Sequence, residues 1–240
     1  MTEKAAYKLI KSIFLVIMKK FCMVLLILAC LIAFLFVCGT IDEETETKTK
    51  SVSVYDEKTV AVTFDDGPGA ESTMMLLDGL KERNVRAAFF LVGENIKGHE
   101  DIVKRMHDEG HIIGNHTYTH VILTKIPQEK ALEEIYNTNK IIEEITGEKV
   151  KYIRPPCGEW NNDMFFQVDL QPVFWNVDPL DWKRKDVGGI VEDVVKNVRS
   201  GDIILLHDIY DTSVAAALEI IDRLKDKGFV FVTVDEILIS

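Results

Sequence analysis

The sequence has few cysteines that could form a disulfide. Three of its four cysteines, Cys22, Cys30 and Cys38, lie in one apolar run near the N-terminus, which leaves Cys157 alone in the rest of the chain. That remaining part therefore cannot form an internal disulfide. Positive charge is also scarce, because 28 Lys and Arg face 39 Asp and Glu and give a net charge of -11. This acidic balance argues against a nucleic-acid partner.

Proline and glycine are sparse as well. The 240 residues include 6 Pro and 14 Gly and show no internal repeat, which excludes collagen-like and long low-complexity chains. Hydrophobic residues make up 47% and charged residues 28%, the proportions of an ordinary globular protein. The length suits one larger domain or two small ones.

One long hydrophobic segment stands near the N-terminus. Residues 21–38 carry no charge, follow five lysines within residues 1–20 and precede the acidic residues 42–44. As a helix this run would span roughly 27 Å, close to the thickness of a bilayer core. We expect a membrane-spanning signal anchor with the basic end in the cytoplasm. Cleavage of a signal peptide after Gly39 and lipid attachment at Cys38 are the alternatives.

The chain divides into four parts on this basis. Residues 39–58 are polar, rich in Thr, Lys and Glu, and have no helical periodicity, which is typical of a linker. The expected order is a basic cytoplasmic head (1–20), the anchor or signal peptide (21–38), the linker (39–58) and a catalytic domain (59–240). Because Met18-Lys19-Lys20 also reads as the beginning of a secretory leader, translation from Met18 is a further hypothesis.

Short apolar runs alternate with helical patterns after residue 59. The predicted strands are 59–64, 86–92, 111–114, 151–153, 172–177, 202–206 and 229–234. The predicted helices are 71–83, 100–109, 127–145, 188–198 and 213–226. This alternation predicts an α/β fold with a parallel sheet, closed as a barrel or open. In both forms the active site lies at the C-terminal ends of the strands.

Two adjacent carboxylates, Asp65 and Asp66, end the first predicted strand. They stand in the stretch Thr63-Phe64-Asp65-Asp66-Gly67-Pro68. Because neighbouring side chains at a strand end point in different directions, one carboxylate can bind a metal while the other faces a substrate. The alternative is an ordinary strand that ends in a solvated turn.

A pair of histidines, His116 and His120, follows the third predicted strand. On one helical turn the spacing of four residues would place both imidazoles on one face, as metal ligands require. A zincin metalloprotease needs Glu after the first His, and Thr117 occupies that position, which excludes this class. Two His and one Asp leave coordination positions open, as catalytic zinc sites require. Two surface histidines on a polar turn are the alternative.

Three more polar clusters follow later strands. Arg154 leads into the rigid Pro155-Pro156 turn, where a permanently charged guanidinium can hold a carboxylate and a backbone N–H can face a reacting oxygen. Asp181-Trp182 follows the fifth strand, and His207 follows the apolar strand 202–206. Opposite a metal site His207 would be a natural general acid, although a lone His is more often structural.

These five clusters, in this order, resemble the polysaccharide deacetylase family, also called carbohydrate esterase family four or the nodulation-type deacetylase homology domain. The motifs are TFDDGP, H-T-x-x-H, RPPxG, DxxDW and LLHD, and the resemblance covers about residues 60–239. It implies a distorted (β/α) barrel of about seven strands. It also implies a divalent metal cofactor, with Zn²⁺ expected and Co²⁺ or a related ion as the alternative.

The resemblance also implies catalytic roles. Asp65 would be the general base, held by Arg154, and His207 would be the general acid, tuned by Asp181. The metal ligands would be Asp66, His116 and His120.

Four residues would contact the substrate under the same resemblance. The backbone N–H of Cys157, in the turn that begins at Pro155, would help bind the oxyanion, and Trp182 and Leu205 would form the pocket for the acetyl methyl group. Family members usually carry an aromatic residue at the position of Cys157. The stretch 161–173 is also shorter than usual, so its helix is expected to be reduced to one or two turns around 162–168.

The resulting expectation is a metal-dependent hydrolase that removes N-acetyl groups from aminosugar polymers. A membrane tether favours cell-wall peptidoglycan as substrate and a position outside the cytoplasmic membrane, or secretion if the leader is cleaved. A chitooligosaccharide deacetylase and an acetylxylan esterase are the alternatives within the family. A catalytically inactive wall-binding module is the alternative from another class. The catalytic domain is expected to be a monomer.

Overall fold

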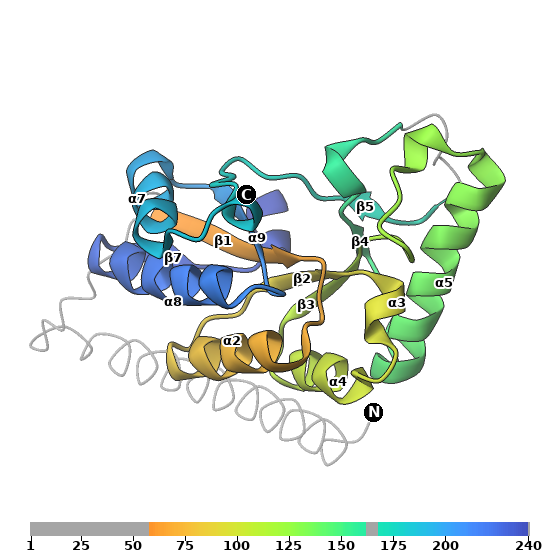
Figure 1. Cartoon of the computed structure of the whole chain (residues 1–240), viewed down its shortest axis with the longest axis horizontal. Coiled ribbons are helices and arrows are strands. Elements are labelled where there is room, and N and C mark those ends of the chain that lie inside the picture. The colour runs from red at the N-terminus through yellow and green to blue at the C-terminus, as the bar shows by residue number, and fades with distance from the viewer. Residues whose placement is uncertain (1–57, 162–167, 240) are drawn as a thin grey trace, which may run out of the picture. The chain divides into compact units, whose positions relative to one another are not determined.

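The computed structural model describes residues 58–161 and 168–239 (Figure 1). Strands and helices alternate along these residues, as the sequence predicted. The predicted head and anchor, the linker up to residue 57 and the short helix expected around 162–168, up to residue 167, lie outside the described residues. Among the helices that are described, none combines the length and the hydrophobicity that crossing a bilayer requires.

In the described residues seven parallel strands form one sheet, in the order β5-β4-β3-β2-β1-β6 with β7 also paired to β1. The strands are β1 (Lys58–Asp65), β2 (Ala88–Leu91), β3 (Ile112–Asn115), β4 (Tyr152–Ile153), β5 (Gln171–Pro172), β6 (Asp202–His207) and β7 (Phe229–Phe231). β6 occupies one edge of β1, while β7 and β2 share the other edge. β1 is therefore paired along both edges and has three strand partners.

The sheet curls into a distorted barrel. β5 pairs with β4, and further along the same segment Val177 forms an isolated parallel bridge with Ile204 of β6. Two backbone hydrogen bonds of 2.9 Å accompany this bridge, from Asn176 N–H to the Ile203 carbonyl and from Leu205 N–H to the Val177 carbonyl. Residues 171–177 thus connect the two ends of the sheet, and the strand predicted at 172–177 is divided between two partners.

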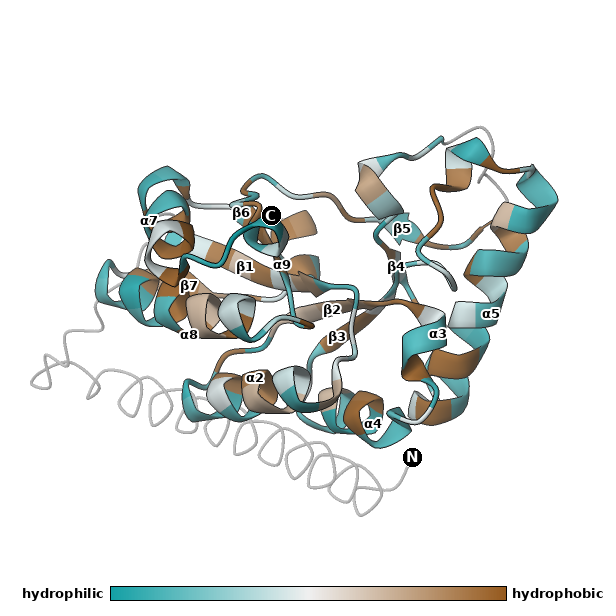
Figure 2. Cartoon of the chain, viewed as in Figure 1, coloured by the Kyte–Doolittle hydropathy of each residue, from teal (hydrophilic) through white to brown (hydrophobic). Residues whose placement is uncertain are grey.

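Alternating side chains of the strands build two separate cores. On β1, Val60, Val62 and Phe64 pack in the cluster against the helices, whereas Ala61 packs in the cluster inside the barrel. Asp65 has the parity of Ala61 and therefore faces the barrel interior. The helices around the outer cluster are α2 (Ala70–Glu82), α4 (Glu100–Asp108), α5 (Gln128–Thr146), α7 (Val187–Asn197) and α8 (Asp211–Asp226). Figure 2 shows hydrophobic strands among helices of mixed hydropathy.

Capping residues explain where two of the helices begin and end. α5, predicted at 127–145, has Pro127 as its N-cap residue and ends at Gly147, which has φ of 75°. The predicted strand 229–234 is too long, because Thr233 forms a capping box and begins the short helix α9 (Val234–Leu238). The remaining short elements are α3 (Gly93–Ile96) and the 3-10 turns η1 (Leu123–Lys125), η2 (Pro156–Gly158) and η3 (Asp181–Lys183).

Candidate metal centre and active site

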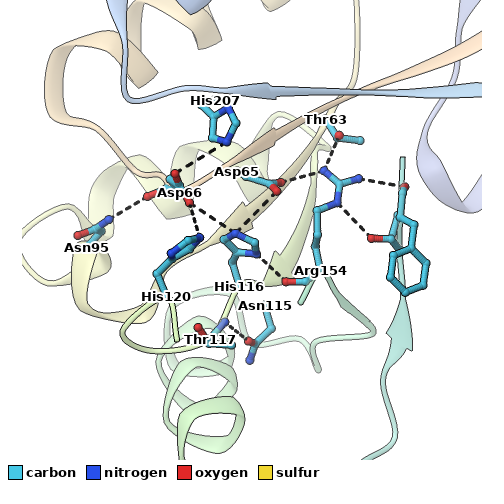
Figure 3. Close-up of polar contacts among 12 residues, drawn as sticks. Thr63, Asp65, Asp66, Asn95, Asn115, His116, Thr117, His120, Arg154 and His207 are labelled. Atoms are coloured by element: carbon cyan, nitrogen blue, oxygen red, sulfur yellow. Dashed lines mark hydrogen bonds and ion pairs between the residues drawn. The ribbon is translucent and has the colours of Figure 1, made fainter. Parts of the chain in front are cut away.

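Polar side chains meet at the C-terminal ends of β1, β3 and β6, together with Arg154, which directly follows β4 (Figure 3). Asp66 lies at their centre. Its Oδ1 atom is 3.5 Å from His116 Nε2 and 3.4 Å from His120 Nε2. The three residues can each offer one ligand atom within 4.8 Å of the others. The structure therefore brings the three predicted metal ligands together.

The chemistry of this cluster fits a divalent cation. Asp66 Oδ1 is buried and has no hydrogen-bond partner among the described residues, although a buried carboxylate oxygen normally has one. Burial alone would raise the pKa of Asp66, but the facing imidazoles of His116, His207 and His120 lower it. One carboxylate and two imidazoles are a donor set suited to Zn²⁺ and related ions.

A backbone carbonyl fixes the orientation of the His116 ring. His116 Nδ1 lies 2.5 Å from the carbonyl oxygen of Arg154. Because a carbonyl only accepts hydrogen bonds, Nδ1 carries the proton and Nε2 keeps a free lone pair. Nε2 is the ring nitrogen that faces Asp66, so its lone pair is available to a metal ion at this site. Such a hydrogen bond on the far nitrogen is the usual support for a histidine that binds metal.

The two histidines do not lie on a helical turn, so this part of the prediction is wrong. Residues 116–122 form a loop after β3. Thr117 and His120 have φ of 65° and 56°, and these left-handed residues turn the chain back so that the imidazole centroids lie 4.9 Å apart. The loop places the rings together as a helix would have done.

Two residues that sequence reasoning missed hold this loop. Asn115 Oδ1 accepts a hydrogen bond of 2.7 Å from Thr117 N–H. Glu134 Oε2 on α5 accepts hydrogen bonds from Tyr118 N–H at 2.9 Å and from Thr119 N–H at 2.7 Å. Asn115 could have been noticed as a polar residue at a strand end beside the first histidine. Glu134 carries no local signal, because only the folded chain brings it to the loop.

Asp65 and Arg154 form a buried ion pair inside the barrel. Arg154 is fully buried, and its Nη1 donates to Asp65 Oδ1 at 2.8 Å and to Thr63 Oγ1 at 2.7 Å. Its other donors reach the carbonyl oxygens of Val173, at 3.1 Å from Nε, and Phe174, at 3.3 Å from Nη2. With Oδ1 engaged by Arg154, Asp65 directs Oδ2 toward the candidate metal ligands, where it lies 3.7 Å from His116 Nε2.

His207 lies near the other carboxylate oxygen of Asp66, Oδ2, and is held by Asp181. His207 Nδ1 lies 2.8 Å from Asp181 Oδ1, and the backbone N–H of His207 donates to Asp181 Oδ2 at 2.9 Å. Burial alone would lower the pKa of His207, but the hydrogen bond and charge of Asp181 raise it to about 9. His207 Nε2 is 3.9 Å from Asp66 Oδ2 and so faces the cluster.

The four residues predicted to contact substrate differ in exposure, and Pro155, the first of them, is buried. Cys157 lies in η2, directly after Pro155-Pro156, and is exposed with φ of 58°. Trp182 follows Asp181 in η3 and is 48% exposed. Leu205 is buried in β6, two residues before His207.

Comparison with known proteins agrees with the motifs. The polysaccharide deacetylase family matches residues 53–170. The peptidoglycan-N-acetylmuramic acid deacetylase PdaC of Bacillus subtilis is 40% identical over 181 residues, which cover 75% of this chain and 39% of PdaC. A peptidoglycan-N-acetylglucosamine deacetylase of Bacillus cereus is 42% identical over 190 residues, which cover 75% of this chain and 68% of that protein.

Solved structures show the same fold. The structure of PdaC aligns with a TM-score of 0.73 at 40% identity, covering 76% of this chain and 90% of that chain. BA3943 of Bacillus anthracis, described as a pseudoenzyme of carbohydrate esterase family four, aligns with a TM-score of 0.71 at 28% identity, covering 76% and 66%. This chain spans about two fifths of the full length of PdaC and about two thirds of that of the B. cereus relative. Sequence, fold and the clustered motif residues together show that the chain belongs to the polysaccharide deacetylase family.

Proposed function

We propose that this chain is a metal-dependent N-deacetylase of aminosugar polymers, with peptidoglycan as its substrate. The observation that carries the proposal is that a buried carboxylate and a hydrogen-bonded imidazole both face the three metal ligands: Asp65 Oδ2 lies 3.7 Å from His116 Nε2, and His207 Nε2 lies 3.9 Å from Asp66 Oδ2. Hydrolysis of an amide needs a base for the attacking water and an acid for the leaving amine. The names of the two relatives support peptidoglycan as the substrate class, and they differ in the sugar that is deacetylated.

Asp65 serves as the base in this mechanism. A divalent cation held by Asp66, His116 and His120 would polarise the acetamide carbonyl and make water easier to deprotonate. Asp65 accepts the proton of the attacking water at Oδ2, because Arg154 occupies Oδ1. The water oxygen bonds to the carbonyl carbon in the same step. Arg154 keeps the carboxylate plane fixed through this transfer.

His207 serves as the acid. Its Nδ1 is engaged by Asp181, so the proton leaves from Nε2, the nitrogen that faces the cluster. The C–N bond breaks as this proton reaches the amine nitrogen, and the products are acetate and a free amino sugar. A positioned acid is needed because an unprotonated amine is a poor leaving group.

The remaining residues would shape the acyl site. The backbone N–H of Cys157 would donate to the oxyanion, a contribution that does not depend on the side chain. Trp182 and Leu205 would surround the acetyl methyl group. Zn²⁺ is the proposed ion, and Co²⁺ suits the same ligands. BA3943 is a pseudoenzyme with this fold, so the fold alone does not imply activity. The proposed activity of this chain rests on its acid, base and ligand residues.

The location follows from the N-terminal sequence. We propose that residues 21–38 anchor a monomeric domain at the outer side of the membrane, within reach of peptidoglycan. The test is protease treatment of intact spheroplasts, which should degrade the catalytic domain. Resistance to the protease until the membrane is lysed would contradict this orientation.

The activity is tested by acetate release from peptidoglycan, chitooligosaccharide and acetylxylan, with the full-length chain and added Zn²⁺. We expect most acetate from peptidoglycan, its loss with a chelator, and its recovery when Zn²⁺ or Co²⁺ is returned. Faster release from acetylxylan would contradict N-deacetylation as the main activity. No release from any substrate would favour the inactive wall-binding module.

A further inference from the structure

The turn 66–69, between β1 and α2, carries Asp66, the proposed metal ligand that faces both His116 and His120. Asp66 has φ of 75°, a left-handed conformation that a residue other than glycine adopts only when its surroundings hold it there. The position of its carboxylate therefore depends on what holds this turn.

One side of the turn is held by the β2–α3 connection. Asn95 Nδ2 donates to the carbonyl oxygen of Asp66 at 2.8 Å, as Figure 3 shows. Val92 N–H donates to the carbonyl oxygen of Gly67 at 3.1 Å. These two contacts fix the peptide groups that follow the metal ligand.

The other side of the turn meets Asp208, a fully buried carboxylate that directly follows His207. Its Oδ2 atom accepts a hydrogen bond of 2.5 Å from Thr73 Oγ1 on α2. Thr73 Oγ1 in turn accepts the N–H of Gly69 at 2.8 Å. A Cβ atom at Gly67 would clash with both carboxylate oxygens of Asp208, so the carboxylate is packed directly against the turn.

The catalytic steps above leave Asp208 without a role. Its Oδ1 atom has no hydrogen-bond partner in the part of the chain that is described. Keeping a buried carboxylate in this state is costly, and such groups persist where the surrounding structure needs their position. The glycine at 67 is required for the same contact, because no side chain fits between the turn and the carboxylate.

We propose that Asp208 and Thr73 form a clamp that positions Asp66 as a metal ligand. Asp208 is a positioning residue, since it acts through Gly67 and Gly69 rather than on the substrate. Because Asp208 directly follows His207, the last residue of β6, the clamp also fixes the distance between the His207 imidazole and the three proposed metal ligands. This inference rests on the metal site of the proposed function.

The test measures Co²⁺ affinity of the full-length chain by titration of the visible absorption of the bound ion. Thr73→Val keeps the shape of the side chain but removes the hydroxyl and its hydrogen bonds with Gly69 N–H, Asp208 Oδ2 and, at 3.5 Å, the Asp208 carbonyl oxygen, whereas Thr73→Ser keeps them. We expect about tenfold weaker Co²⁺ binding for Thr73→Val, the loss typical of a group that supports a metal ligand, and nearly unchanged binding for Thr73→Ser. Asp208→Asn, which replaces one carboxylate oxygen with an amide nitrogen of similar size, is expected to weaken binding as well.

Thr233→Val is the matched control for stability. Thr233 is also a buried threonine with a hydrogen-bonded hydroxyl, but it caps α9, which packs against the inner core cluster with Ala61 and Ile203 rather than against the turn 66–69. Loss of the Thr233 hydroxyl should lower Tm and leave Co²⁺ affinity unchanged. Wild-type affinity in Thr73→Val and Asp208→Asn would overturn the clamp alone. Absence of Co²⁺ binding in the wild-type chain would overturn the metal site, and with it the clamp.

Discussion

Asp65 and Asp66 are neighbours in the sequence but have different surroundings. Asp65 is the last residue of β1 and points into the barrel, where it meets Arg154. Asp66 leaves the strand with a left-handed backbone and points between two histidines. A single change of backbone conformation therefore separates the proposed base, Asp65, from the proposed metal ligand, Asp66.

Asparagine at each position distinguishes the two roles. Asp66→Asn should weaken metal binding, because it removes the charged ligand. Asp65→Asn should keep the metal and lose turnover, and it should also destabilise the fold by on the order of 3 kcal/mol, since Arg154 then lacks its buried counter-charge. The measurements are Zn²⁺ affinity, acetate release and urea unfolding. Equal metal affinity in the two variants would show that the roles are misassigned.

The pH dependence tests His207 as the acid. His207 must be protonated to donate, so kcat/KM should fall as pH rises through about 9, the pKa to which Asp181 raises it. Asp181→Asn keeps a hydrogen-bond acceptor but removes the negative charge. The pKa of His207 then falls, and the alkaline limb of the profile moves to lower pH by roughly 1 to 3 pH units. An unmoved limb in Asp181→Asn would assign the acid to another group.

At the scale of elements, the helix and loop boundaries show which features the sequence could predict. Local signals were sufficient for α5, because Pro127 and Gly147 mark its two ends. They were misleading for the loop 116–122, where a spacing of four residues suggested a helical turn. The actual loop depends on Glu134, which lies on another element, and on left-handed residues that no local pattern announces. The convergence of the motifs was predictable, because parallel strands bring their C-terminal ends together.

The loop that carries the histidines should depend on Glu134 of α5. Glu134→Ala removes the acceptor for Tyr118 N–H, Thr119 N–H and the Thr119 hydroxyl. We expect about tenfold weaker metal binding, because His120 follows directly after these residues. Glu133→Ala is the control, since Glu133 lies on the same helix and pairs only with exposed Lys130 among its described contacts. Comparable losses in both variants would attribute the effect to α5 in general.

At the scale of the whole molecule, the active site is assembled from residues far apart in sequence. Arg154 reaches Thr63 and Asp65 across 91 and 89 residues, and Asp181 reaches His207 across 26. Residues 171–177 connect β4 to β6 and also supply the carbonyl oxygens that accept from Arg154. Closure of the barrel and orientation of the Asp65 carboxylate, through Arg154, thus depend on the same segment.

The pairing of β1 along both of its edges has a consequence for how the domain unfolds locally. β1 pairs with β6 along one edge and with β7 and β2 along the other. Amide protons of such a doubly paired strand exchange with solvent only through the largest openings of the molecule, whereas edge strands open more readily. Asp65 is the last residue of this strand, and Asp66 follows it. Fluctuations that release α9 therefore leave the paired edges of β1 intact, and the backbone position of Asp65 is lost only in the cooperative unfolding of the domain.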